Sequence, residues 1–238
     1  MAYDSKLFND KVFKLRATTV APTAVANLGD IRYADGTGWD PGSGKGYYGW
    51  NGSYWEPMGL MLGAQEGFRD LPTDINVRGT GANDPTWSAF FGNIYAYKFA
   101  ASTMQQAWAN FHINHDYAAV TPLYLHLHWS TAGTNTGVVR WGFEYSIAKG
   151  HNQGNFPATT TLYVEQAAQG TAYRHMIAET VAISDAAIEV DSIIMCRVFR
   201  DAAHGNDTCT DAAFGFYADV HYQSDRFATK NKAPSFYA

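Results

Sequence analysis

The chain has 238 residues, a formal net charge of −5 at pH 7, 16% charged residues and 15% aromatic residues. Low charge with many aromatic side chains argues against disorder, and the absence of any run of Lys or Arg argues against a nucleic-acid partner. We expect no membrane insertion because no apolar stretch is long enough to span a bilayer, and the two cysteines make no disulfide framework and suit a reducing cytoplasm.

Residues 1–16 form a short arm in which apolar and charged side chains are interspersed. Such a segment can become ordered when it binds the surface of another protein. We therefore predict that residues 1–16 are an attachment arm. Its candidate interface residues are Leu7, Phe8, Val12 and Phe13.

Residues 17–65 are rich in glycine and aromatic side chains and predict a small β-meander. A strand is expected at residues 29–34, and Asn51-Gly52 between aromatic pairs indicates a type I′ hairpin. The aromatic side chains of this module suit a small core or an interface, and they could also stack on a sugar. The ligand-contact candidates are Trp39, Tyr48, Trp50, Tyr54 and Trp55.

Residues 63–90 read as a loop, and strands are expected after them. Apolar side chains alternate at Ala107, Ala109, Phe111 and Ile113, which favours a strand over the helix that residues 102–109 could also form. The same period of two recurs at residues 123–129 and 138–147. Further strands are expected at residues 159–166, 174–180, 192–200 and 213–223. About eight strands with turns between them predict an all-β fold, a jelly-roll β-sandwich over residues 66–238.

No catalytic motif is present. Residues 41–46 (PGSGKG) resemble a phosphate-binding loop but have Trp39 and Gly46 where that motif needs Gly and Ser or Thr. The nucleophile elbow and the His-Glu-x-x-His motif are absent. A carboxylate pair for glycoside cleavage could come from Glu144, Glu165, Glu179, Glu189, Asp191, Asp201, Asp211 or Asp219. Because any chain of this size contains such residues, we expect no enzymatic activity and no catalytic residue.

His126 and His128 lie two residues apart on an expected strand and therefore project from one face. With His221 they could form a metal site, or they could hydrogen-bond locally as a polar face. We predict a polar interface network without metal or other cofactor, with all three histidines as interface candidates. Its expected partners are Arg140, Glu144, Asp219 and His221. The remaining histidines, at positions 112, 115, 151, 175 and 204, follow no zinc spacing.

Several segments now described resemble proteins of tailed bacteriophages. Residues 29–36 (GDIRYADG) through 49–57 (GWNGSYWEP) are similar to a short module of phage fibre and virion proteins. The remainder resembles a family of phage structural proteins. The segments that carry this second resemblance are residues 125–129 (LHLHW), 137–145 (GVVRWGFEY), 196–201 (CRVFRD) and 219–226 (DVHYQSDR).

The resemblance implies a virion structural protein, made in the cytoplasm of the bacterial host and assembled as a homotrimer with other virion proteins. Within that role we predict a short tail fibre or spike that contacts the host surface, with a surface glycan as a possible ligand. A capsid decoration protein that stabilises the phage head is the alternative. A polysaccharide-degrading enzyme is a distant third. The family supplies no catalytic residues.

Overall fold

The protein is described from a computed structural model, which places residues 17–18, 20, 27–28, 30–41, 44–58, 67–77 and 81–237. The arm candidates Leu7, Phe8, Val12 and Phe13 lie outside these residues. The chain divides into two compact units, Met1–Gln65 and Glu66–Ala238. The described residues are built from strands and contain no helix that could cross a membrane.

The first unit holds one sheet in the order β1-β2-β3-β4. Its strands are β1 (Ala17–Thr18), β2 (Ile31–Ala34), β3 (Gly46–Trp50) and β4 (Trp55–Pro57). Strand β1 pairs with β2 in parallel, and the other neighbours are antiparallel. A small core forms from Ala34, Trp39 and Tyr48, with Trp55 packed against it. The aromatic residues therefore give this short meander its own apolar centre.

The hairpin at Asn51-Gly52 exists, but its turn differs from the predicted type I′. Trp50 pairs with Trp55, so four residues connect β3 to β4 rather than two. Gly52 has a positive φ of 99°, while a type I′ turn needs a positive φ at both central residues. The Asn51 side chain accepts hydrogen bonds from the backbone of Ser53 and Tyr54, each at 3.0 Å. This local capping by Asn51 explains the longer loop.

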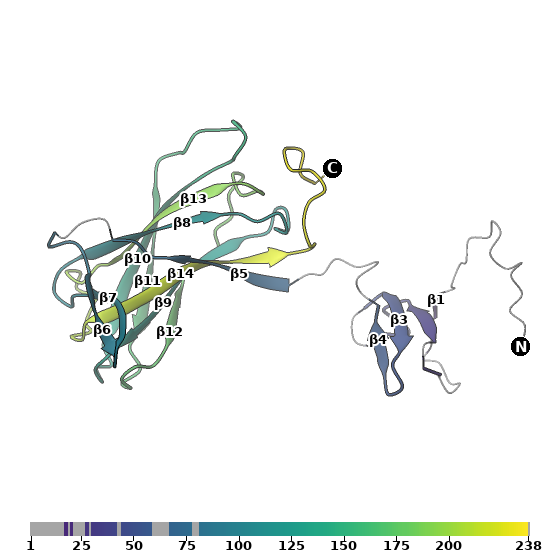
Figure 1. The fold of residues 1–238 in the computed structure, drawn as a ribbon, viewed down its shortest axis with the longest axis horizontal. Coiled ribbons are helices and arrows are strands. Elements are labelled where there is room, and N and C mark those ends of the chain that lie inside the picture. Colours follow the sequence, from purple (N-terminus) through teal and green to yellow (C-terminus); the bar gives the residue numbers. More distant parts are fainter. Residues whose placement is uncertain are drawn as a thin grey trace, which may run out of the picture. The chain divides into compact units, whose positions relative to one another are not determined.

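The second unit is a two-sheet sandwich (Figure 1). One sheet has the order β11-β10-β13-β8, and the other contains β12-β9-β14, with β5 and the β7-β6 pair both joined to β14. The strands are β5 (Gly67–Asp74), β6 (Thr86–Phe91), β7 (Ile94–Phe99), β8 (Gln105–His112), β9 (Leu123–Thr131), β10 (Val138–Ala148), β11 (Thr160–Ala167), β12 (Met176–Glu179), β13 (Ile193–Arg200) and β14 (Ala213–Ser224).

The strand pairs of this unit are nested in sequence like a rolled-up hairpin. The innermost pair is β10 with β11, followed outward by β9 with β12, β8 with β13, and β5 with β14. Alternate pairs in this series fall in opposite sheets. Nesting of this kind defines a jelly roll, so the predicted fold class is confirmed. The β6–β7 hairpin is an insertion between the first two strands of the roll.

The prediction of a loop over residues 63–90 was wrong for β5 and for β6. Pro72 obscured β5, because proline cannot donate to a sheet ladder. Of the described strands, β5 pairs only with β14, so Pro72 lies on an edge strand where proline is tolerated. The following hairpin turns at Gly92-Asn93, with a positive φ of 55° at Gly92. A Gly-Asn step is a recognised hairpin signal that the sequence already carried.

The core lies between the two sheets, and the alternation of the sequence sets it up. Leu125, Leu127 and Trp129 are 0–1% exposed on β9, and Trp141 and Phe143 are fully buried on β10. The face predictions for these strands and for β8 are thereby confirmed. Because side chains alternate along a strand, His126 and His128 of β9 lie on the opposite face of the sheet, away from this core.

Candidate functional site

The outward face of β9 and its neighbours carries a row of ionisable side chains. In the register of the sheet His126 pairs with Glu179 of β12 on one side and with Asp219 of β14 on the other. His128 follows two residues along β9 and pairs with Tyr217. Although this face points away from the core, His126 is 6% exposed, His128 is 7% and Asp219 is 1%. We call His126, His128, Asp219, Glu179 and His175 the histidine face.

Short polar contacts connect the histidine face into a chain. Glu179 Oε2 lies 2.7 Å from Nε2 of His126, and Asp219 Oδ2 lies 2.7 Å from Nε2 of His128. Nδ1 of His128 lies 2.7 Å from Nε2 of His175, so one of these nitrogens donates to the other. Nδ1 of His126 lies 3.0 Å from Oδ1 of Asp219, within ion-pair distance. Both ring nitrogens of His126 and His128 thus face a polar partner.

The electrostatics separate the two imidazoles of β9. Burial lowers the pKa of His126, but the carboxylates of Asp219 and Glu179 outweigh it and raise that pKa overall. For His128 burial dominates, and Asp219 offsets it only in part, so its pKa is lowered. Burial raises the pKa of Asp219, yet the imidazoles beside it bring that pKa below its ordinary value. A carboxylate anion between two imidazoles is therefore the stable form of this cluster.

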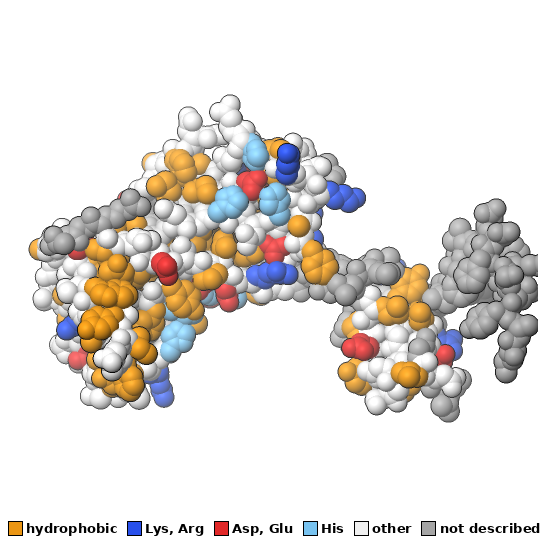
Figure 2. Space-filling view, viewed as in Figure 1, with side chains coloured by type: hydrophobic (Ala, Val, Ile, Leu, Met, Phe, Trp, Pro, Cys, Tyr) orange, Lys and Arg blue, Asp and Glu red, His pale blue; other side chains and the backbone are white. Residues whose placement is uncertain are grey.

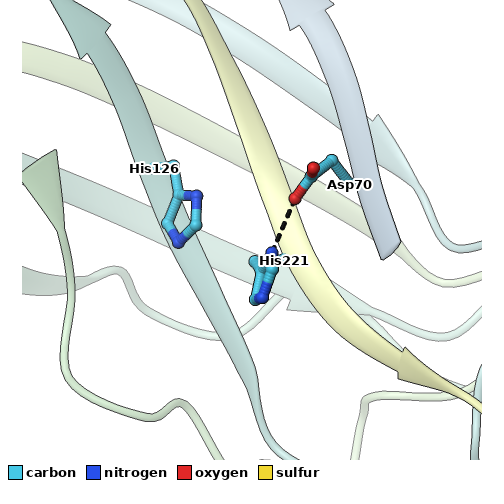
Figure 3. A group of neighbouring side chains, drawn as sticks. All are labelled: Asp70, His126 and His221. Carbon is cyan, nitrogen blue, oxygen red and sulfur yellow. Dashed lines mark hydrogen bonds and ion pairs between the residues drawn. The ribbon is translucent and has the colours of Figure 1, made fainter. Parts of the chain in front are cut away.

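His221 lies beside this face and belongs to a second, more exposed contact. Its Nδ1 donates to Oδ1 of Asp70 on β5 at 2.6 Å, and its ring stacks on that of His126 with centroids 5.0 Å apart (Figure 3). Phe68 stacks on the other face of His221 at 4.6 Å. The side chain of Asp70 is 62% exposed, so this arrangement is open to solvent on the β5 side.

Two groups of ligating atoms on this face lie close enough to bind a metal ion. They are His126, His128 and Asp219, all buried, and Asp70, His126 and His221. In each group the ligating atoms lie within 4.8 Å of one another. The structure thus brings together the three histidines singled out by the sequence and the expected partner Asp219, and it adds the carboxylate of Asp70 from β5.

Two expected partners of the histidines lie elsewhere. Arg140 contacts Glu165 and Asp201, while Glu144 pairs with Arg197, all on or beside the other sheet. They face away because β10 belongs to the opposite sheet of the sandwich. Sequence reasoning treated all strands as potential neighbours, whereas the rolled topology separates β10 from β9.

A second histidine cluster surrounds Asp191, just before β13. Its carboxylate lies 2.7 Å from Nε2 of His151 and 3.2 Å from Nε2 of both His112 and His115. Figure 2 shows histidine side chains gathered around an acidic side chain on the surface of this unit. These residues come from three separate segments, at positions 112–115, 151 and 191, so their spacing along the sequence gave no signal. Phe236, near the C-terminus, packs its ring against His115 and His151.

The β6–β7 hairpin presents the largest exposed aromatic side chains of its sheet. Trp87, Phe91, Ile94 and Tyr95 are 57%, 59%, 65% and 50% exposed. Figure 2 shows hydrophobic side chains gathered over this hairpin. Residues 86–97 (TWSAFFGNIYAY) contain no charged side chain at all. Sequence reasoning missed this surface, although the uncharged aromatic run around Gly92 marked it.

The ligand-contact candidates of the first unit divide into buried and accessible side chains. Trp39 is 7% exposed and Tyr48 is 1%, both within the small core. Trp50 and Trp55 are half-buried and contact one another, with ring centroids 5.5 Å apart. Tyr54 is 60% exposed. A sugar contact by this module therefore stays a prediction that involves Tyr54 first.

The acidic residues considered for glycoside cleavage all have structural partners. Arginine or lysine side chains pair with Glu144, Glu165, Asp201 and Glu189, and histidines with Glu179, Asp191 and Asp219. Asp211 accepts a hydrogen bond from the backbone of Asn135. These contacts give each carboxylate a role in packing. That the protein is not an enzyme remains an expectation.

No protein-family model and no curated protein matches the chain. Among solved structures it is similar to the CBM36-1 domain of a multidomain xylanase from the hindgut metagenome of Trinervitermes trinervoides, with TM-score 0.33 and 9% identity, covering 65% of this chain and 96% of that one. It is also similar to a chain of infectious bursal disease virus Gx strain, with TM-score 0.33 and 11% identity, covering 76% of this chain and 39% of that one. Similarity of this size carries no argument about function.

Proposed function

We propose that this protein is an oligomeric structural component of a bacteriophage particle. The exposed aromatic surface of the β6–β7 hairpin is the observation that carries the proposal. In this proposal, copies of the jelly-roll domain contact one another through the hairpin. We identify the particle as a bacteriophage because residues 29–36, residues 49–57 and the later motifs resemble phage virion proteins.

The hairpin has features that an unpartnered edge of a soluble protein avoids. Strand β6 ends its sheet, so one side of its backbone has no ladder partner among the described strands. Natural edge strands are protected by charged side chains, proline or a covering segment. Strand β6 has no charged residue and no proline. Contiguous exposed apolar surface of this kind marks an interaction site.

A second copy of the same chain is the occupant that fits this surface best. An uncharged aromatic patch needs no oppositely charged surface on its partner. It can therefore face an identical patch or another apolar part of the same domain. Trp87 stacks near Tyr95 and meets Tyr97 edge-on, which leaves a rigid aromatic ridge. Rigid tryptophan and tyrosine side chains lose little entropy on binding and often dominate contact energies.

The test is to place a charge on the hairpin and measure the oligomeric state. Trp87→Lys and Ile94→Lys should convert a stable oligomer, which we expect to be a trimer, into monomers at micromolar concentration. Light scattering coupled to size-exclusion chromatography gives the mass, and circular dichroism checks that the variants fold. Val181→Lys is the matched control, because Val181 is 71% exposed outside the hairpin. A wild-type protein that is monomeric at micromolar concentration would refute the proposal.

Within the particle we favour a short tail fibre or spike that contacts the host surface. The chain pairs a small aromatic module with a larger jelly-roll domain, which suits one unit for attachment and another for display. A capsid decoration protein is the alternative. Labelling intact particles with an antibody against residues 66–238 and imaging them by electron microscopy separates the two locations. Label at the tail tip supports the fibre, and label over the head supports decoration.

A glycan at the host surface is the ligand we propose for the fibre role. A shallow groove of about 400 Å³ crosses the outer face of the β8-β13-β10-β11 sheet. Trp108, Phe156 and Met195 give it apolar walls, and Glu144 and Arg197 supply charged groups. Aromatic faces with a few polar groups suit a sugar ring. Trp108→Ala should abolish binding to host-surface glycan arrays if this groove is the contact.

A further inference from the structure

We propose that His126, His128 and Asp219 form a binding site for one zinc ion that joins β9 to β14. Two imidazole nitrogens and a carboxylate are ligands that zinc prefers. The inference departs from the sequence-based expectation of a metal-free network, because the positions of the individual ring atoms are now known. It concerns a site separate from the β6–β7 surface and does not depend on the proposed function.

The inner atoms of the three residues have the separations of ligands around one ion. Nδ1 of His126 is 3.0 Å from Oδ1 of Asp219, and Nε2 of His128 is 2.7 Å from Oδ2. Tetrahedral zinc with bonds near 2.0–2.1 Å places neighbouring ligand atoms roughly 3.3 Å apart. The ligating atoms of all three residues lie within 4.8 Å of one another. Movements of a fraction of an ångström to about 1.5 Å would therefore bring them onto one ion.

The outer ring nitrogens are already held as they are in metal sites. Nε2 of His126 donates to Glu179, and Nδ1 of His128 contacts His175, each at 2.7 Å. A metal-bound histidine usually gives its other N–H to a carboxylate or another acceptor, which fixes the tautomer and orients the ring. If the outer nitrogen carries the proton, the inner nitrogen presents a lone pair. Glu179 thus leaves Nδ1 of His126 free to ligate.

One buried atom of this cluster is unsatisfied unless a cation is present. Oδ1 of Asp219 accepts no hydrogen bond from any residue that the structure describes, although Asp219 is only 1% exposed. A buried polar atom without a partner destabilises the folded state, because it has lost its hydrogen bonds to water. With neutral imidazoles, that oxygen and the lone pair of His126 Nδ1 face each other at 3.0 Å and repel. A divalent cation between them turns the repulsion into two coordinate bonds.

Ring orientation selects this group over the neighbouring group of Asp70, His126 and His221. A metal ion lies close to the plane of every imidazole that binds it. The rings of His126 and His221 are stacked on one another, with centroids 5.0 Å apart and an interplanar angle of 22° (Figure 3), and His221 gives its Nδ1–H to Asp70. The rings of His126 and His128 are tilted by 52° with centroids 6.5 Å apart, so their planes can cross between them. His221 therefore packs against the site and does not ligate.

The primary experiment measures zinc in the full-length protein. Untagged protein from zinc-supplemented cells, dialysed against metal-free buffer, should hold close to one zinc per chain by inductively coupled plasma mass spectrometry. Asp219→Asn and His128→Asn should each lower that content at least about tenfold, and Glu179→Gln should weaken zinc affinity by about ten- to a hundredfold. His221→Asn and His115→Asn are the matched controls and should retain the zinc.

A second measurement does not depend on how well the variants fold. Wild-type protein stripped with EDTA and loaded with cobalt(II) chloride should show the visible absorption of four-coordinate cobalt with nitrogen and oxygen ligands. Zinc chloride added to the stripped protein should raise its thermal midpoint, because an ion that binds only the folded state stabilises it. Wild-type protein without zinc and without a cobalt spectrum would overturn the proposal. So would loss of zinc from His115→Asn with retention in Asp219→Asn, which would place the ion at Asp191.

Discussion

At the scale of single residues, Arg200 and Asp207 form a buried ion pair. Both side chains are 0% exposed. Arg200 donates through Nε and Nη2 to the two oxygens of Asp207, at 2.9 and 2.7 Å. It also donates to the backbone carbonyls of Cys209 and Asp211. The guanidinium thereby holds the segment between β13 and β14 in place. The carboxylate of Asp207 compensates the charge of Arg200.

Arg200→Ala should lower the free energy of unfolding by about 3–5 kcal/mol, because it leaves the Asp207 carboxylate buried without its partner. Arg200→Lys should recover only part of that loss, since an ammonium cannot make the two parallel bonds. Chemical denaturation gives both values. Arg226→Ala is the control, where a partly exposed pair with Asp225 should contribute at most about 1 kcal/mol. Equal losses for Arg200→Ala and Arg226→Ala would contradict the assignment.

The Asp191 cluster should make stability depend on acid pH. Burial raises the pKa of Asp191, but the hydrogen bond from His151 and the charges of His115 and His112 lower it below its ordinary value of 3.8. A carboxylate whose pKa is depressed by folding contributes stability that is present above pH 3.8 and is lost as the pH falls through the folded-state pKa. We therefore expect the free energy of unfolding to fall with decreasing pH below about 4.

Asp191→Asn should weaken that acid dependence, because the amide does not titrate. Urea denaturation at several pH values between neutral and strongly acidic conditions measures the slope. Asp74→Asn serves as the control, since Asp74 is exposed and lies on the other sheet. If both variants keep the wild-type slope, the cluster around Asp191 does not stabilise the fold through its charge.

At the scale of elements, the contact between β10 and β13 depends on a glycine. Gly142 pairs with Phe199 across the two strands, and the ring of Phe199 lies where a Cβ of residue 142 would be. A Cβ at Gly142 would come 2.1 Å from Cζ of Phe199. Arg197 covers the ring with its guanidinium carbon 4.4 Å from the centroid. The aromatic ring fills the space above the glycine, which is a known way of compensating glycine in a strand.

Gly142→Ala should destabilise the protein by about 1–3 kcal/mol, because Phe199 must leave its packed position. Thermal denaturation measures the loss. The double variant Gly142→Ala with Phe199→Ala should be less destabilised than the sum of the two single variants, since the clash disappears with the ring. Gly205→Ala is the control, because a Cβ there meets nothing within 4 Å. Additive effects of the two changes would show that the ring does not press on residue 142.

At the scale of the whole molecule, the two units have separate apolar centres. The core of the jelly roll is built from residues between Ile75 and Phe236, and that of the small unit from Ala34, Trp39 and Tyr48. Each unit therefore packs around an apolar centre of its own.

Deleting residues 1–16 should therefore leave a folded, oligomeric protein that no longer joins the phage particle. The thermal midpoint should stay within error of the wild type, because every residue known to form the two cores is retained. Complementation of a phage that lacks the gene, followed by protein analysis of purified particles, measures incorporation. A second form with Leu7, Phe8, Val12 and Phe13 changed to Ser tests whether the apolar side chains carry the attachment. Normal incorporation of the truncated protein would refute the role of the arm.

The sequence by itself determined the fold class and most of its strands. Alternation with period two, as in Leu125, Leu127 and Trp129, requires one buried face per strand whatever the neighbours are, so local pattern sufficed. It likewise placed His126 and His128 together on the outward face. The hairpin at Asn51-Gly52 was also predictable from the sequence, although hydrogen bonds to the Asn51 side chain altered its turn.

Only the tertiary structure decided which strands became neighbours, and the candidate sites depend on that. The roll brings Glu179, His126 and Asp219 into one cross-strand row from three strands far apart in sequence. It gathers three histidines around Asp191, and it places Pro72 on an edge strand. Strand pairing is non-local: it follows from how the two sheets close over one core, and spacing along the chain carries no record of it.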